Sequence, residues 1–300
     1  MEPRTKILVT GKEGQLGKEL QLLALQYPSL ELIFTDRNLI DITCREDIAN
    51  FLDQHKVQYL INCAAYTNVD NAQQDPLAKS VNTIAPGLLG QEASKRNVRV
   101  IHISTDYVFS GKSSTPYTEK DEPHPLSEYG ISKLEGEREL QKSCPNSIIL
   151  RTSWLYSPFG KNFVKTMLHL GEQKNSIKVV EDQIGSPTYA YDLATAILEI
   201  ICQCEYGTLD FVSGIYHYTN QGVCSWYDFA QEIQHMAHTN CKIIAIGSKD
   251  YPTVAPRPHY SVLNKSKIKH IFEVEIPYWK KSLKHCIKRL QNRDIETNNI

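Results

Sequence analysis

Strand-like and helix-like patterns alternate along the first half of the chain, and this alternation restricts the possible folds more than any other feature. Short apolar runs indicate strands at 6–9, 30–35, 57–62, 98–104 and 147–150. Between them, apolar residues recur at helical spacing over 15–25, 47–55, 75–95 and 127–142. Strands that alternate with helices in this way predict a parallel sheet covered by helices on both faces. We therefore expect a Rossmann-type, doubly wound α/β sheet. Pro86 is expected to start a new helix or to kink the one around it.

The second half of the chain is less regular and richer in proline. Helical stretches are expected at 163–170, 192–202, 226–237 and 278–290. We assign 1–155, together with roughly 185–219, to a dinucleotide-binding sheet domain. The segments 156–184 and 220–290 would build a smaller, mixed α/β part that binds the substrate. The polar segment 291–300 is expected to be a frayed tail.

Charge and cysteine usage restrict the class of partner. The formal net charge is -1, from 33 basic and 34 acidic residues, so no strong field favours nucleic acid or a membrane surface. The apolar run at 7–9 is too short for the core of a signal peptide, and no apolar stretch approaches a membrane span. None of the eight cysteines has C-x-x-C spacing. We expect reduced thiols, a cytoplasmic protein, and neither a nucleic-acid nor a membrane partner.

A glycine-rich loop follows the first expected strand and opens the first expected helix. Its glycines, Gly11, Gly14 and Gly17, have the spacing G-x-x-G-x-x-G. Such a loop lets a pyrophosphate approach backbone N–H groups at a helix N-terminus. The alternative is a turn that merely permits close packing; the spacing does not match a nucleoside-triphosphate P-loop.

The end of the second expected strand favours the dinucleotide interpretation. Asp36 lies where an acidic residue can accept hydrogen bonds from the adenosine ribose. The neighbouring Arg37 is instead suited to the 2′-phosphate of NADP, so both NADH and NADPH remain candidate cofactors. Asp41 and Ile42 follow closely and could flank the adenine.

Tyr129 and Lys133 are four residues apart in an expected helix and therefore share one face. A nearby ammonium group would lower the pKa of the phenol, which makes Tyr129 a competent general acid or base. Thr105 ends the fourth expected strand, at the sheet edge where open α/β sheets bind ligands. Its hydroxyl could hydrogen-bond the substrate oxygen that receives the proton.

These motifs together resemble the extended short-chain dehydrogenase/reductases. Six further strings, which span nearly the whole chain from about 6 to 290, closely resemble the family of dTDP-4-dehydrorhamnose reductases. They are Asn62-Cys-Ala-Ala-Tyr-Thr67, Ser104-Thr-Asp-Tyr-Val-Phe109, Arg151-Thr-Ser-Trp154, Asn162-Phe-Val-Lys-Thr-Met167, Asp182-Gln-Ile-Gly-Ser-Pro-Thr188 and Arg257-Pro258.

The resemblance implies reduction of the C4 ketone of a dTDP-linked keto-sugar, with Tyr129 and Lys133 as the catalytic pair. It implies that the cofactor is lined by Gly14, Gln15, Leu16, Asp36, Asp41, Ile42, Ala65, Tyr66, Thr67 and Ile103. Thr105, Asp106 and Trp154 would contact the sugar nucleotide, and Asn162 and Arg257 would add to that surface. A guanidinium such as that of Arg257 suits a diphosphate because it can form two parallel hydrogen bonds.

Three alternatives remain at this point. An epimerase or 4,6-dehydratase could use the same fold, although Asp106 is followed by Tyr107 and not by the second acid of a dehydratase. A non-catalytic regulatory subunit is known in the family but need not keep the Tyr/Lys pair.

Some members are magnesium-linked dimers, and Glu19 could supply one carboxylate to such a site. Cationic side chains near the C-terminus would repel Mg²⁺, so we expect no metal and leave a homodimer open; His235 and His238 are assigned to a surface helix.

Overall fold

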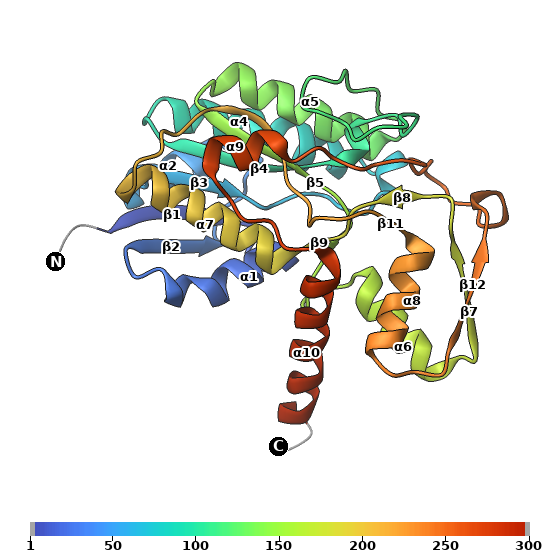
Figure 1. Ribbon diagram of the computed structural model, residues 1–300. Helices are drawn as coiled ribbons and strands as arrows, with labels where there is room; N and C mark the ends of the chain where they lie inside the picture. The colour runs from blue at the N-terminus through green and yellow to red at the C-terminus, as the bar shows by residue number, and fades with distance from the viewer. Residues whose placement is uncertain (1–3, 298–300) are drawn as a thin grey trace.

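The computed structural model describes residues 4–297. Its centre is a six-stranded parallel sheet in the order β10-β5-β4-β3-β1-β2 (Figure 1). The strands are β1 (Thr5–Thr10), β2 (Leu30–Thr35), β3 (Tyr59–Asn62), β4 (Arg99–Thr105), β5 (Ser147–Thr152) and β10 (Gly214–His217). The expected doubly wound parallel sheet is confirmed.

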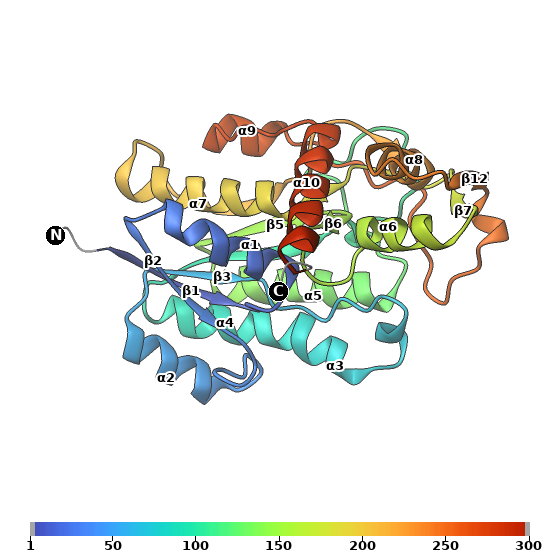
Figure 2. The same cartoon turned by 90° about the horizontal axis from the view of Figure 1, so that it is seen from below.

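Helices cover both faces of this sheet (Figure 2). One face carries α1 (Gln15–Leu23) and α7 (Ala190–Tyr206), and the other carries α2 (Arg45–His55), α4 (Ala85–Ser94) and α5 (Glu128–Ser143). Side chains alternate between the two cores along β1: Ile7 and Val9 belong to the α1/α7 side, whereas Leu8 belongs to the other. This is why a strand buried on both faces reads as a continuous apolar run.

The chain order reverses in the sheet between β1 and β3. Open α/β sheets bind ligands outside the carboxyl ends of the strands at such a switch point. Here β1 and β3 end level with each other, since Thr10 pairs with Asn62, while Asn62 pairs with His102 and β4 continues beyond it to Thr105. The site described below is built on this edge.

A second lobe lies beyond the sheet. It contains α6 (Phe163–Gln173), β7 (Ser176–Val180), α8 (Trp226–Met236) and β12 (Lys242–Ile246), with the short strands β6 (Leu155–Tyr156), β8 (Ile184–Gly185), β9 (Thr188–Tyr189) and β11 (Cys224–Ser225). α10 (Trp279–Thr297) projects from the body in Figure 1. Leu283, Cys286 and Ile287 of α10 pack into the apolar core of this lobe.

Several elements differ from the sequence-based expectations. The sixth strand, β10, and the parallel pair β7/β12 were not predicted. α9 (Ser266–Phe272) packs on β10 and returns the chain to the sheet within the segment 220–290. The stretch 75–95 is divided into α3 (Pro76–Lys79), a π-helical turn η3 (Ser80–Ile84) and α4. Pro86 lies in the first turn of α4, directly after the π-helical turn.

The remaining short turns of 3₁₀-helix are η1 (Ala24–Gln26), η2 (Asn71–Gln73), η4 (Asp106–Val108) and η5 (Ser248–Asp250). α10 continues to Thr297, into the segment 291–300 that is expected to fray, and 298–300 lie outside the described residues. Among the described helices, none is both long enough and apolar enough to cross a membrane.

Candidate active site

Three neighbouring cavities lie along the carboxyl edge of the sheet. The loop cavity, about 340 Å³, lies between the glycine loop and the ends of β2 and β3. The central cavity, about 550 Å³, lies over the ends of β4 and β5, and the outer cavity, about 500 Å³, lies against the second lobe. Gly14 and Ala65 line both of the first two, while Tyr107 lines both the central and the outer cavity. The arrangement can therefore hold an elongated ligand at one end and a second ligand at the other.

The glycine loop leaves room for a phosphate at the start of α1. Gly11 has φ +73°, and a Cβ there would lie 2.8 Å from the Ala64 nitrogen. A Cβ on Gly17 would lie 2.4 Å from the Gly11 carbonyl oxygen, so this glycine serves close packing of the loop. Gly14 caps α1 without a side-chain hydrogen bond, which leaves the first N–H groups of the helix to an anion. These features fit a dinucleotide pyrophosphate.

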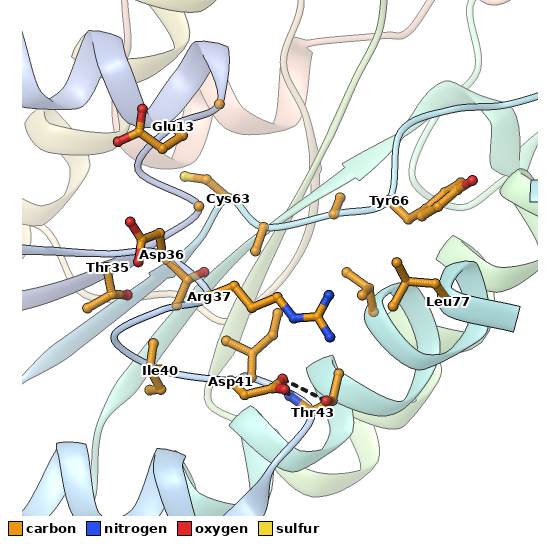
Figure 3. Close-up of a pocket in the computed structure, with 17 residues that line it drawn as sticks. Glu13, Thr35, Asp36, Arg37, Ile40, Asp41, Thr43, Cys63, Tyr66 and Leu77 are labelled. Atoms are coloured by element: carbon orange, nitrogen blue, oxygen red, sulfur yellow. Dashed lines mark hydrogen bonds between the residues drawn. The ribbon is translucent and has the colours of Figure 1, made fainter. Parts of the chain in front are cut away.

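The loop cavity gathers the residues expected around the adenosine (Figure 3). They are Asp36, Arg37, Asp41, Ile42, Ala65 and Tyr66. The Arg37 guanidinium points into the cavity, whereas the Asp41 carboxylate accepts hydrogen bonds from the Thr43 hydroxyl and N–H. Thr67 and Ile103, which are also expected along the cofactor, line the central cavity.

Asp36 is paired with a cation that the sequence reasoning did not consider. The Lys12 ammonium lies 2.9 Å from its carboxylate, and the N–H groups of Asn38 and Leu39 also donate to it. The hydrogen bond from Lys12 is the main reason that the pKa of Asp36 is lowered. Lys12 thus neutralises the negative charge beside Arg37.

The central cavity brings together Thr105, Asp106, Tyr129 and Lys133. Ser127 caps α5 by accepting a hydrogen bond from the Gly130 N–H, which fixes the first turn that carries Tyr129. The Tyr107 ring contacts Tyr129 edge-on, with 5.5 Å between ring centroids. Burial raises the pKa of Asp106 to about 6, so this carboxyl is neutral in part of the population near neutral pH.

The charges around Tyr129 differ from the expectation that Lys133 lowers its pKa. Burial raises the pKa of Tyr129, and a hydrogen bond with Thr105 opposes that shift. The Lys133 nitrogen instead donates to the Ile103 carbonyl at 2.7 Å and lies 3.2 Å from Nε2 of His102. Burial lowers the pKa of Lys133 to about 8. Here, therefore, Tyr129 is held as a neutral phenol.

Trp154 is positioned by stacking in the wall of the central cavity. Its φ is +49°, and its ring stacks on Trp226 with 3.7 Å between centroids. A Cβ on Gly185 would come within 2.6 Å of the Trp154 ring, so only glycine leaves room for this side chain.

The side chain of Asn162 is hydrogen-bonded to other protein groups, and among the described residues it does not line any of the three cavities. Its oxygen accepts from the Lys165 N–H and so caps α6. Its amide donates to the Ser157 and Phe159 carbonyls and to Gln15, whose own amide donates to Leu155. Asn162 thereby holds Gln15, a wall of the central cavity, against the second lobe.

Arg257 lines the outer cavity. The Tyr107 ring, which contacts Tyr129, separates this cavity from the central one. The Arg257 guanidinium donates two hydrogen bonds of 2.9 Å to the Asp70 carboxylate and one of 3.1 Å to the Tyr107 hydroxyl. Trp226, Phe163 and Met167 supply an apolar wall beside it. The cavity therefore combines a positioned guanidinium with flat apolar surface, as a nucleoside diphosphate requires.

Five residues at the site were missed by sequence reasoning: Lys12, Asp70, His102, Tyr107 and Trp226. Lys12 and Tyr107 had a local signal, because Lys12 lies inside the glycine loop and Tyr107 inside the string 104–109. Asp70, His102 and Trp226 come from segments far apart in the sequence, and only their contacts reveal them.

Glu19 is buried, and its carboxylate receives hydrogen bonds of 3.0 and 2.9 Å from Arg289. In this structure the Glu19 carboxylate is therefore engaged by a cation of α10. Within residues 4–297, no group of three or more His, Cys, Asp or Glu side chains is arranged to hold a metal.

A switch-point crevice with a glycine-rich first turn and a Tyr/Lys pair on the helix after β4 defines the class of extended short-chain dehydrogenase/reductases. Comparison with known proteins narrows this class. The family model described as RmlD substrate binding domain matches residues 5–292. A dTDP-4-dehydrorhamnose reductase from Aggregatibacter actinomycetemcomitans is 41% identical over 93% of this chain and 97% of its own length.

Solved structures agree. A dTDP-4-dehydrorhamnose reductase from Clostridium acetobutylicum has a TM-score of 0.90 and 41% identity, covering 96% of this chain and 100% of its own. The enzyme of that name from Bacillus anthracis, solved in complex with NADP, has a TM-score of 0.90 and 34% identity, covering 95% and 99%. This chain belongs to the family of dTDP-4-dehydrorhamnose reductases.

Proposed function

We propose that this protein reduces the C4 keto group of dTDP-4-dehydro-β-L-rhamnose with NADPH or NADH to give dTDP-β-L-rhamnose, the last step of dTDP-rhamnose biosynthesis. One observation carries the proposal. Tyr129, Lys133 and Thr105 converge in a central cavity that joins the glycine-loop cavity on one side and the Arg257 cavity on the other. Relatives that match almost the whole chain bear the name of this activity.

The proposed cofactor site is the loop cavity and the near wall of the central cavity. Gly11, Gly14, Gly17 and the N-terminus of α1 would bind the pyrophosphate, with Gln15 and Leu16 alongside. Asp36, Arg37, Asp41, Ile42, Ala65 and Tyr66 would surround the adenosine, and Thr67 and Ile103 the nicotinamide half. A bound dinucleotide supplies the hydride.

The proton would come from Tyr129. A phenol whose pKa is raised by burial keeps its proton at neutral pH, which is the form that reduction needs. Thr105, which shares a hydrogen bond with Tyr129, would orient the same substrate oxygen. Lys133 would hold the ribose hydroxyls of the dinucleotide and stabilise the phenolate after transfer.

The proposed substrate site extends from the central to the outer cavity. Asp106 and Trp154 would contact the sugar, and Arg257 the diphosphate. Asn162 would act through Gln15, which it holds in place. Binding energy from the nucleotide would position the small keto-sugar for reaction.

Cofactor choice would depend on three charges at the end of β2. Because Lys12 neutralises Asp36, the negative charge that would repel a 2′-phosphate is reduced, and Arg37 points into the same cavity. We propose use of both cofactors with a modest preference for NADPH. We also place the enzyme in the cytoplasm, where reduced thiols persist; each of its eight cysteines is free.

The direct test is conversion of dTDP-4-dehydrorhamnose with NADPH, followed by mass spectrometry of the product. A gain of two hydrogens per sugar, with NADPH oxidised in equal amount, is expected. Tyr129→Phe serves as the matched control. An isomerised product of unchanged mass would indicate an epimerase, and binding without turnover would indicate a regulatory subunit.

A further inference from the structure

A buried chain of hydrogen bonds connects the glycine-loop end of β1 to the amine of Lys133. Thr10 and Asn62 end β1 and β3, His102 lies beside them in the middle of β4, and each of the three is about 1% exposed. The Thr10 hydroxyl donates to Oδ1 of Asn62 at 2.7 Å. Nδ2 of Asn62 lies 3.0 Å from Nδ1 of His102, and Nε2 of His102 lies 3.2 Å from Nζ of Lys133.

The orientation of the Asn62 amide is determined by its surroundings. Its Oδ1 also accepts from the backbone N–H of Ala64 at 3.2 Å, and a backbone N–H can only donate. The amide NH₂ must therefore face His102. Since this NH₂ is a donor without acceptor capacity, Nδ1 of His102 has to accept.

This requirement sets the tautomer of His102. A neutral imidazole that accepts at Nδ1 carries its proton on Nε2, and a doubly protonated ring would direct Nδ1–H at the Asn62 amide. The Nε2–H group then faces Lys133. An ammonium has three donors and no lone pair, whereas an amine can accept this hydrogen bond and still donate to the Ile103 carbonyl.

We propose that Asn62 and His102 are positioning residues that favour the uncharged amine form of Lys133 in the free enzyme, and that dinucleotide binding shifts Lys133 toward the ammonium form, with uptake of a proton from solvent. The inference rests on the role proposed for Lys133 and concerns how that role is controlled. An uncharged Lys133 leaves Tyr129 protonated. The negative phosphates and ribose hydroxyls of the cofactor then favour the ammonium form, which stabilises the phenolate left by proton transfer.

Among the other charges around Lys133, Glu137 raises the pKa of Lys133, but burial has the larger, opposite effect. Within the described residues Lys133 forms no ion pair, and the nearest acid on its own helix, Glu137, is engaged by the buried Arg151 at 2.6 Å. Burial lowers the pKa of Lys133 to about 8 and that of His102 well below its usual value. The titratable groups that share the central cavity with Lys133 are Glu13, Cys63, Asp106, Tyr107, Tyr129 and Lys161.

The first measurement uses the wild-type protein alone. In ¹⁵N-labelled protein, the ring-nitrogen shifts of His102 report which nitrogen carries the proton, and we expect Nε2. The Lys133 amine, assigned with a Lys133→Met variant, should titrate near pH 8. A proton on Nδ1 of His102, or a Lys133 that stays charged up to its ordinary pKa of about 10.4, would overturn the proposal.

The second measurement uses a variant that exchanges the donor and acceptor roles of the two ring nitrogens of His102. In Asn62→Asp the carboxylate accepts from Nδ1–H, which frees Nε2 to accept from a Lys133 ammonium. We expect the proton to move to Nδ1 and the Lys133 midpoint to rise by roughly 1–3 pH units. Thr10→Val is the matched control: it removes one buried partner of Asn62 but keeps the Ala64 N–H, so tautomer and midpoint should not change. A raised midpoint with an unchanged tautomer would contradict the proposed cause.

The third measurement follows the proton. NADPH binding is titrated calorimetrically at pH 9 in buffers of different ionisation enthalpy. We expect uptake on the order of one proton per dinucleotide in the wild type, and a much smaller uptake in Asn62→Asp. Equal uptake in both would refute the coupling. Because none of these measurements involves the sugar substrate, they can fail or succeed independently of the proposed reductase activity.

Discussion

Replacement of Arg257 by alanine tests the substrate class most directly. One N–H of Nη2 is shared between the two oxygens of Asp70 and one N–H of Nη1 donates to Tyr107, so three of the five N–H donors of Arg257 remain for a ligand. A hydrogen bond to a charged partner contributes about 1.5–3 kcal/mol, so Arg257→Ala should weaken dTDP binding roughly tenfold to 150-fold. The Asp70 carboxylate, 40% exposed, would then lack its partner and would add repulsion against the diphosphate.

Arg257→Ala, Asp70→Asn and the double variant form a double-mutant cycle. Calorimetric titration with dTDP measures the affinity of each variant and requires no turnover. Asp70→Asn frees Arg257 and should leave dTDP affinity unchanged or improve it. The double variant should recover part of the loss, because the repulsive carboxylate is gone. NADPH affinity serves as the control and should not move. A dTDP affinity of Arg257→Ala within twofold of wild type would refute the assigned role, and a wild type that does not bind dTDP would refute the substrate class.

Three further predictions follow from the site. Tyr129→Phe should lower kcat by about a hundredfold or more while NADPH still binds in fluorescence titrations, and a near-normal rate would exclude Tyr129 as the acid. Lys12→Ala and Arg37→Ala should each raise the dissociation constant for NADPH and spare NADH; equal losses for both cofactors would contradict recognition of the 2′-phosphate. Burial raises the pKa of Asp106 from 3.8 to about 6, so the folded state binds this proton more tightly than the unfolded chain. The free energy of unfolding should therefore fall as the pH rises from 4 to 6. In urea titrations, the free energy of unfolding of Asp106→Asn should exceed that of wild type by about 3 kcal/mol at pH 7 but not at pH 3.

Local patterns were enough to predict five of the six strands of the central sheet. The second strand was placed at 30–35 and is observed as Leu30–Thr35, and the glycine loop was expected between a strand and a helix, where it lies. Such features depend on side-chain periods of two and 3.6 residues and on the conformational demands of single turns, all of which act within a few residues. The same locality puts Tyr129 and Lys133 on one helical face.

Contacts between distant segments could not be obtained this way. β10 is a four-residue strand whose place in the sheet depends on pairing with β5. Asn162 carried a motif signal that suggested ligand binding, but its hydrogen bonds cap α6 and hold Gln15. Periodicity indicates which face of an element is buried and does not indicate which element will cover it.

The chemistry of the site likewise depends partly on the sequence alone and partly on the tertiary structure. The sequence by itself determined which groups could act: a phenol and an amine one helical turn apart, together with a glycine loop. Only the tertiary structure decided their charges, because it placed His102 and the Ile103 carbonyl against Lys133 and Lys12 against Asp36. Protonation depends on burial and on the donors and acceptors within a few ångströms, and those neighbours come from separate strands brought together by the whole fold.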